Sequence, residues 1–369
     1  MNNSPLFSTY IIDGVQQEPS PARILAAVSS PFAFAPSEPE GGRIIDETLD
    51  PGVSGLTTDA AQLFEYLSLT DSAARKASVI FPSEYTRGRI EKALIDCIWR
   101  MGSFRLGDLC LDAGWTWNSG ALGNMAAFYA SVRAAGDFLD ALGLSLRSYS
   151  YKEGELQVEF KADLRPGTDA ESLVETPFSA EKPRIGAASL PSVLQPDAKS
   201  WIVYIPFDTS SYRLGASLLA KALGNEPATA PSIDDADYFL DCYEVVRELV
   251  EDGILLSAAT VSDGGLIRAL RNMGSAGTGA EIDLSDLRRA SGEQDPVRLL
   301  FAEVPGALVQ IRDIDFDYLD AELLLQDIAF YPLGHPYANG GIKLRSSAKS
   351  GIQNILESLI RNQGGEGED

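Results

Sequence analysis

The chain has 369 residues, 45% of them hydrophobic and 22% charged, and this balance excludes a disordered or fibrous protein. Its 30 Lys and Arg against 53 Asp and Glu give a net charge of −23, which disfavours nucleic acid as a partner. No stretch approaches the roughly 18 apolar residues of a membrane span, and the first residues lack a basic region followed by an apolar run, so we expect a cytoplasmic protein with no membrane partner.

The length exceeds what one hydrophobic core usually holds, which predicts two domains. A stretch rich in proline, at about 163–200, is too irregular for one element, and we expect the domain boundary inside it. The predicted segments are an irregular N-terminal arm, an N-terminal domain, a C-terminal domain, and a C-terminal helix with an acidic tail, at residues 1–53, 54–165, 166–342 and 343–369.

Helical spacing dominates the N-terminal domain. A helix that begins at Ser83 or Glu84 has apolar residues at 90, 94, 97 and 98, and a second helix is predicted over 120–142. The alternating segments LRSYSY and LQVEF then flank Glu153 and Gly154, which is a hairpin signal.

The C-terminal domain mixes strands and helices. We expect strands at 201–205, 307–311 and 328–331, helices at 212–224, 235–253, 316–326 and 347–361, and a strand, loop and helix over 254–274. The predicted class is therefore α+β, with mostly antiparallel sheets covered by helices on one side.

The single histidine and the three cysteines limit the possible chemistry. Ser/His/Asp or Cys/His catalysis would have to use His335, which stands in a Gly-His-Pro sequence, and we expect a turn or surface residue there. The thiols of Cys97, Cys110 and Cys242 are far apart and lack a pairing motif, so we expect buried free thiols. No catalytic residue is assigned.

The segment Val261-Ser-Asp-Gly-Gly-Leu266 follows an apolar strand and precedes a helix. Ser262 or Asp263 can cap that helix, and Gly264 and Gly265 let backbone N–H groups approach a ligand, as they do at phosphate sites. By itself the pattern is weak, because strand-to-helix turns with Asp-Gly are common.

The order of several segments carries more information than this turn. YRLGASLLAKALG, then ATVSDGGLIRALRNMGSAGTGAEIDL, then LLFAEVPGALVQI resemble the C-terminal domain of the aminoimidazole ribonucleotide synthetase superfamily. Upstream, ALIDCIWRMGSFRLGDLCLDAGWTWNS and NMAAFYASVRAAGDFLDALGLSL resemble the second half of formylglycinamidine ribonucleotide synthase. The resemblance extends over about residues 55–340.

This resemblance implies two domains like those of the synthetase and an N-terminal sheet that pairs with a second copy to form a barrel. We therefore expect a homodimer, or a heterodimer with a first-half partner, because half a barrel would expose strand edges and an apolar face. The implied cofactor is ATP or ADP with magnesium; the alternative is no cofactor. The resemblance does not extend to the family's glutaminase domain, so we expect that the chain by itself cannot draw ammonia from glutamine.

The family's nucleotide and metal ligands are only partly kept. By motif, the metal ligands fall on Asp59, Lys92, Asp96 and Asp263, where the family has Asp, Glu, Asn and Asp. The implied metal ligands are thus Asp59, Asp96 and Asp263, and the implied nucleotide contacts are Asp263, Gly264, Gly265 and Lys92. The family's Gly-Lys-Asp-Ser loop would lie at 145–152 and is absent, as is a histidine near 259–260.

Three functions remain open. The favoured one is a divergent, non-catalytic relative that acts as a scaffold or binding subunit. The second is an ATP- and magnesium-dependent ligase of the purine-biosynthesis type, active with a partner half. The third ignores the resemblance and is an acidic α+β protein whose pockets are unrelated to nucleotides.

Overall fold

The structure is a computed structural model, and it describes residues 4–36, 43–50, 56–73, 76–102, 104–165, 190–208, 211–224, 229–231, 233 and 235–345. The expected C-terminal helix and acidic tail lie outside the described residues, as does most of the expected domain boundary. The domain limits therefore stay a prediction.

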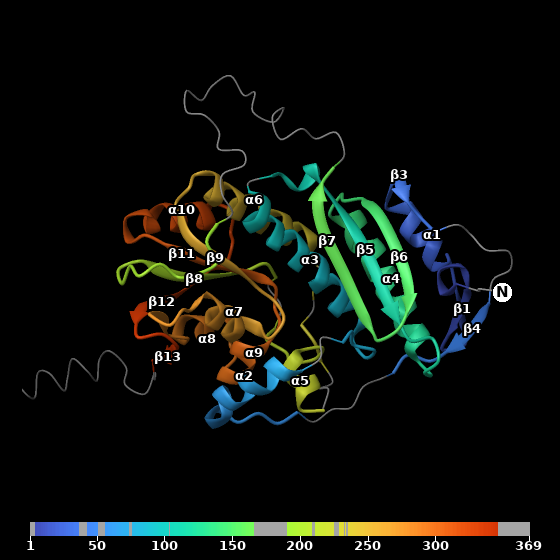
Figure 1. The fold of residues 1–369 in the computed structure, drawn as a ribbon, viewed down its shortest axis with the longest axis horizontal. Helices are drawn as coiled ribbons and strands as arrows, with labels where there is room; N and C mark the ends of the chain where they lie inside the picture. Colours follow the sequence, from blue (N-terminus) through green and yellow to red (C-terminus); the bar gives the residue numbers. More distant parts are fainter. Residues whose placement is uncertain are drawn as a thin grey trace, which may run out of the picture.

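The N-terminal half contains two sheets and four α-helices among its described residues (Figure 1). Its elements are η1 (Pro5–Phe7), β1 (Thr9–Ile12), β2 (Val15–Gln17), α1 (Pro21–Ala27), β3 (Ser29–Phe34), β4 (Ile44–Glu47), η2 (Ala60–Gln62), α2 (Leu63–Ser72), α3 (Pro82–Met101), η3 (Leu106–Asp108), β5 (Leu109–Trp117), α4 (Asn124–Ala141), β6 (Leu146–Glu153) and β7 (Gln157–Leu164).

The C-terminal half forms one large sheet with helices around it. Its elements are β8 (Trp201–Pro206), α5 (Leu218–Ala222), α6 (Ala236–Glu251), β9 (Leu255–Val261), α7 (Gly265–Met273), β10 (Thr278–Ile282), α8 (Ser285–Ser291), α9 (Pro296–Phe301), β11 (Gly306–Ile311), η5 (Asp313–Asp315), α10 (Phe316–Leu325), β12 (Tyr331–Ala338) and β13 (Ile342–Leu344).

The predicted α+β class is confirmed, and the strand orders are β2-β1-β4, β3-β6-β5-β7 and β13-β10-β12-β8-β11-β9. The six-stranded sheet is mostly antiparallel, as expected. The four-stranded sheet is mixed, because β6 runs parallel to both β3 and β5. The predicted hairpin is wrong: β6 and β7 do not pair, because β5 lies between them.

Two hydrophobic clusters hold the fold together. The larger one joins the N-terminal sheets and helices α3, α4 and α6 to one face of the six-stranded sheet. The smaller one fills the other face of that sheet, beneath α2, α7 and α9. Helices therefore cover both faces of the C-terminal sheet, whereas we expected them on one side. Leu6, Tyr10 and Leu25 are buried in the first cluster, so the segment expected to be an irregular arm contributes ordered core.

Two further expectations for the C-terminal half differ from the structure. The helix expected at 212–224 is only α5, because Ala216 has a positive φ of 63° and Ser217 caps the helix through the Ala220 N–H. The strand expected at 328–331 begins only at Tyr331, after Asp327 with φ of 55°. The other predicted helices and strands of the described chain appear close to their expected positions.

Helix α3 connects the two halves. It lies between the four-stranded sheet and the C-terminal half, and it packs on α4, β7 and β9 (Figure 1). Pro82 occupies the first turn, where its missing N–H costs nothing, and Ile90, Leu94 and Ile98 are buried along one face. The polar positions of α3 are consequently placed at the junction of the halves.

Candidate functional site

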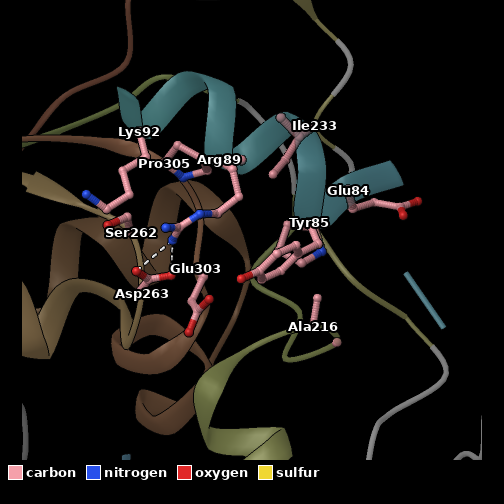
Figure 2. A pocket seen from close by; sticks show the side chains of 13 residues that line it. Glu84, Tyr85, Arg89, Lys92, Ala216, Ile233, Ser262, Asp263, Glu303 and Pro305 are labelled. Atoms are coloured by element: carbon pink, nitrogen blue, oxygen red, sulfur yellow. Dashed lines mark hydrogen bonds and ion pairs between the residues drawn. The ribbon is translucent and has the colours of Figure 1, made fainter. Parts of the chain in front are cut away.

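A pocket lies where α3 meets the turn between β9 and α7, and we call it the α3–α7 pocket (Figure 2). The space open to water-sized molecules in it is about 40 Å³. Binding sites for small molecules usually measure about 300–1,000 Å³, so the pocket as it stands is too small for a nucleotide. Its lining residues are Glu84, Tyr85, Gly88, Arg89, Lys92, Gly215, Ala216, Pro231, Ile233, Ser262, Asp263, Glu303 and Pro305.

The turn that carries Asp263 depends on two glycines in succession. Gly264 and Gly265 have φ of +83° and +71°, a region that residues with a side chain rarely adopt. A Cβ on Gly265 would also lie 2.4 Å from the carbonyl oxygen of Leu300. The sequence Asp-Gly-Gly is therefore needed here to bring the backbone against α9 and to hold Asp263 at the pocket.

Asp263 is engaged by an arginine that the sequence analysis missed. The Arg89 guanidinium donates from one nitrogen to both carboxylate oxygens of Asp263, at 2.7 Å each (Figure 2). The two side chains are 18% and 9% exposed, so this ion pair is largely shielded from water. Burial lowers the pKa of Arg89, but the charge of Asp263 and smaller contributions outweigh it, and the net shift is upward. Arg89 therefore remains a cation beside the expected metal ligand.

Glu303 occupies the amide groups that were expected to receive a phosphate. Its Oε1 accepts from the Gly264 N–H at 2.8 Å and from the Leu218 N–H at 2.7 Å. Burial, followed by the charge of Asp263, raises the pKa of Glu303 to about 7, against the lowering effects of Lys221 and of the two N–H groups. An internal carboxylate thus takes the position of an external anion at the start of α7.

Lys92 and Asp96 form an ion pair one helical turn apart on α3. Asp96 also accepts from the Thr260 hydroxyl, which in turn accepts from the Trp99 indole N–H at 3.0 Å. Lys92 lines the α3–α7 pocket, whereas Asp96 lines a different hollow one turn further along the helix. The two residues that replace the family's Glu and Asn therefore bind each other.

Asp59 lies outside this group. It is exposed, and its side chain caps η2 by accepting from the Ala61 N–H at 2.9 Å. It does not line the α3–α7 pocket. Within the described part of the chain, no three His, Cys, Asp or Glu side chains lie close enough together to hold a metal ion. The residues proposed as metal ligands, Asp59, Asp96 and Asp263, are therefore not gathered at one point.

The sequence offered signals for both missed residues. Arg89, Lys92 and Asp96 recur at helical spacing on α3, so a basic side chain one turn before Lys92 had to face the same neighbour. Glu303 follows the buried Phe301 and Ala302, and an acid at the end of such a segment needs a partner.

The histidine and the cysteines take no part in the pocket. His335 lies on β12 and not in a turn, because that strand pairs with β8 and β10; its Nδ1 is 2.9 Å from the Ser200 carbonyl oxygen, and its ring lies against Trp201. The three cysteines are free and buried, as expected.

The outward face of the four-stranded sheet is polar. Along β5 the residues from Leu109 to Trp117 alternate, and their inward side chains are buried beneath α3 and α4. The outward positions include Asp112, which pairs with Arg147, and Arg147 also binds Asp163 at 3.2 Å. No strongly exposed large apolar side chain of the described residues belongs to β5, β6 or β7, but Phe34 on the edge strand β3 is 81% exposed. The polar surface of β5, β6 and β7 does not match the expected apolar face, and the expected dimer stays a prediction.

Comparison with known proteins finds similarity to a family model and to a purine-pathway synthase. Residues 209–314 match the family described as AIR synthase related protein, C-terminal domain. Human phosphoribosylformylglycinamidine synthase is 26% identical over 243 residues, which cover 64% of this chain and 17% of that protein. The chain thus spans about a sixth of the length of this relative.

The fold is also found among solved structures. PurL from Thermotoga maritima, complexed with FGAR, aligns with a TM-score of 0.50 and 11% identity, covering 72% of this chain and 41% of that one. Protein tt0281 from Thermus thermophilus aligns with a TM-score of 0.45 and 16% identity, covering 89% and 96%. Among the described residues, no helix has the length and apolar character to cross a membrane.

Proposed function

We propose that this chain, an AIR synthase-related protein similar to phosphoribosylformylglycinamidine synthase, is a divergent, non-catalytic relative that acts as a scaffold or binding subunit. The observation that carries the proposal is the shielded ion pair between Arg89 and Asp263. A carboxylate that already holds a guanidinium must lose this partner before it can bind a divalent cation.

Three further features of the α3–α7 pocket support the same function. Lys92 stands where the family has an acid, and at about 4 Å its charge would repel a divalent cation by roughly 1 kcal/mol per unit charge in water and more at lower dielectric. Glu303 accepts a hydrogen bond from the Gly264 N–H, which a phosphate at this position would need. The pocket volume of about 40 Å³ leaves room for a few water molecules only.

The second candidate is an ATP- and magnesium-dependent ligase that works with a partner half. Similarity to phosphoribosylformylglycinamidine synthase over 64% of this chain favours this second function, and a partner half would have to complete the active site. In this case ATP or ADP with magnesium would bind after Arg89 has left Asp263, and Asp96 would have to leave Lys92.

The proposed partner is a second copy of this chain or a first-half chain, bound at the four-stranded sheet. Because the outward face of that sheet carries Asp112, Arg147 and Asp163, such an interface would rest on polar contacts and would weaken with salt. Sedimentation velocity at low and at high salt tests this: a dimer that persists unchanged in about 1 M salt, where charges are screened within roughly 3 Å, would contradict a polar interface.

Phosphate release from MgATP, with and without FGAR, tests the absence of catalysis. The matched comparison is Asp263→Ala, because the second candidate needs that carboxylate and the first does not. We expect no release above the level of Asp263→Ala. Release by the unmodified protein that disappears in Asp263→Ala would overturn the non-catalytic function.

A further inference from the structure

A second hollow lies further along α3, against the edge strand β7, and we call it the α3–β7 pocket. Figure 1 shows β7 at the border of its sheet, running beside α3. The volume of this pocket is about 480 Å³, which lies in the usual range for small-molecule sites. Its lining residues are Ala93, Asp96, Trp99, Arg100, Phe160, Lys161 and Ala162.

The wall of the hollow combines small and aromatic side chains. Ala93 on α3 and Ala162 on β7 line it with small side chains. Trp99 and Phe160 supply aromatic surface at the same pocket. The indole of Trp99 is fixed by its hydrogen bond to Thr260, so this part of the wall is rigid before a ligand arrives.

The charges around the hollow leave Arg100 without an acidic partner. Asp96 is paired with Lys92, and Arg147 pairs with both Asp112 and Asp163. Lys161 lies opposite Asp112 in the sheet and helps to lower the pKa of that carboxyl, and neither Arg100 nor Lys161 forms an ion pair with another described residue. Arg100 is held in place by a hydrogen bond to the Ala162 carbonyl oxygen, and a guanidinium has further N–H groups to offer.

We propose that the α3–β7 pocket binds a small organic anion, a carboxylate or phosphate attached to a planar apolar group. The planar group would lie against Trp99 and Phe160, and the anion would be bound by Arg100 and Lys161. This binding needs no metal ion. It goes beyond the proposed function, because the Lys92–Asp96 pair separates this pocket from the α3–α7 pocket.

Calorimetric titration in the presence of EDTA tests the ligand class with four probes. Phenyl phosphate and benzoate carry both features, inorganic phosphate lacks the ring, and benzyl alcohol lacks the charge. We expect one or both aromatic anions to bind at least roughly fivefold more tightly than either control, and the tighter of the two identifies the anion. No detectable binding of either aromatic anion, or equal binding of a control, would overturn the proposal.

A charge reversal locates the site without disturbing the fold. Lys161 is exposed and lies opposite Asp112, so Lys161→Glu should lower the urea midpoint only slightly and weaken the binding of the aromatic anion roughly tenfold, because an attraction becomes a repulsion. Lys199→Glu makes the same change at an exposed site in the other half and should have no effect. Equal affinities of Lys161→Glu and the unmodified protein would place the ligand elsewhere and refute the assignment.

Discussion

The two halves of helix α3 differ in how their charges are satisfied. In the first half, towards α7, Arg89 pairs with Asp263 and Lys92 with Asp96, and the pocket there has about 40 Å³. In the second half, towards β7, Arg100 donates to a backbone oxygen and forms no ion pair among the described residues, and the pocket there has about 480 Å³. One helix therefore closes one pocket with ion pairs and leaves its neighbour open, although both halves carry similar residue types.

The largest effect is expected from removing the cation of the shielded pair. Arg89→Ala leaves the Asp263 carboxylate, which is 9% exposed, without its guanidinium, and this should lower the free energy of unfolding by about 3–5 kcal/mol. Urea denaturation measures the change. Arg133→Ala removes an exposed arginine from a pair with Asp137 and should cost less than about 1 kcal/mol. Similar losses in both variants would mean that burial of the Arg89–Asp263 pair is unimportant.

The next effect concerns pH and Glu303. Its pKa is about 7 in the folded protein and 4.5 for an ordinary glutamate, so between these values the folded state holds more protons than the unfolded state. The free energy of unfolding should therefore fall as pH rises through this window, by up to about 1.4 kcal/mol per pH unit. In Glu303→Gln this contribution to the pH dependence of the free energy of unfolding should be absent. A parallel pH dependence in the two proteins would show that Glu303 titrates normally.

A smaller effect is expected between the two pockets, at Thr260. Thr260→Val removes the acceptor of the Trp99 indole N–H and the donor to Asp96, and should cost about 1–3 kcal/mol because a buried donor loses its partner. Thr260→Ser keeps the hydroxyl and should recover most of the loss. If Thr260→Val and Thr260→Ser have the same urea midpoint, the Thr260 hydroxyl does not stabilise the Trp99 side of the α3–β7 pocket.

The smallest effect is expected at Lys92. Its side chain is 24% exposed and that of Asp96 is 41% exposed, so Lys92→Ala should cost only about 0.3–0.5 kcal/mol. The cost should vanish when urea denaturation is repeated in about 1 M salt. A salt-independent loss above about 2 kcal/mol would contradict the view that this pair is an ordinary helix-surface pair.

The fold was predictable where periodicity is local. Helices α3, α4 and α6 follow from apolar residues at helical spacing, and β8, β9 and β11 from short apolar runs. The separation of β6 from β7 was not predictable in the same way, because β5 enters between them from about 30 residues earlier in the chain. Pairing between strands that are not consecutive in the chain cannot be read from the local pattern of residues.

The candidate site was predictable at the level of the backbone. Asp263 and Lys92 both line the α3–α7 pocket, and the geometry of the turn after Asp263 demands Gly264 and Gly265. The role of these residues in binding stays a prediction. The ion pairs inside the pocket could not be derived, because Arg89 and Asp263 are 174 residues apart and meet only through tertiary packing.

The central claim is that internal ion pairs close the α3–α7 pocket to nucleotide and metal. Calorimetric titration of ATP into the unmodified protein and Lys92→Glu, each with and without magnesium, tests it most directly. The account predicts weak or no binding to the unmodified protein under both conditions. Micromolar binding by the unmodified protein that requires magnesium would contradict it.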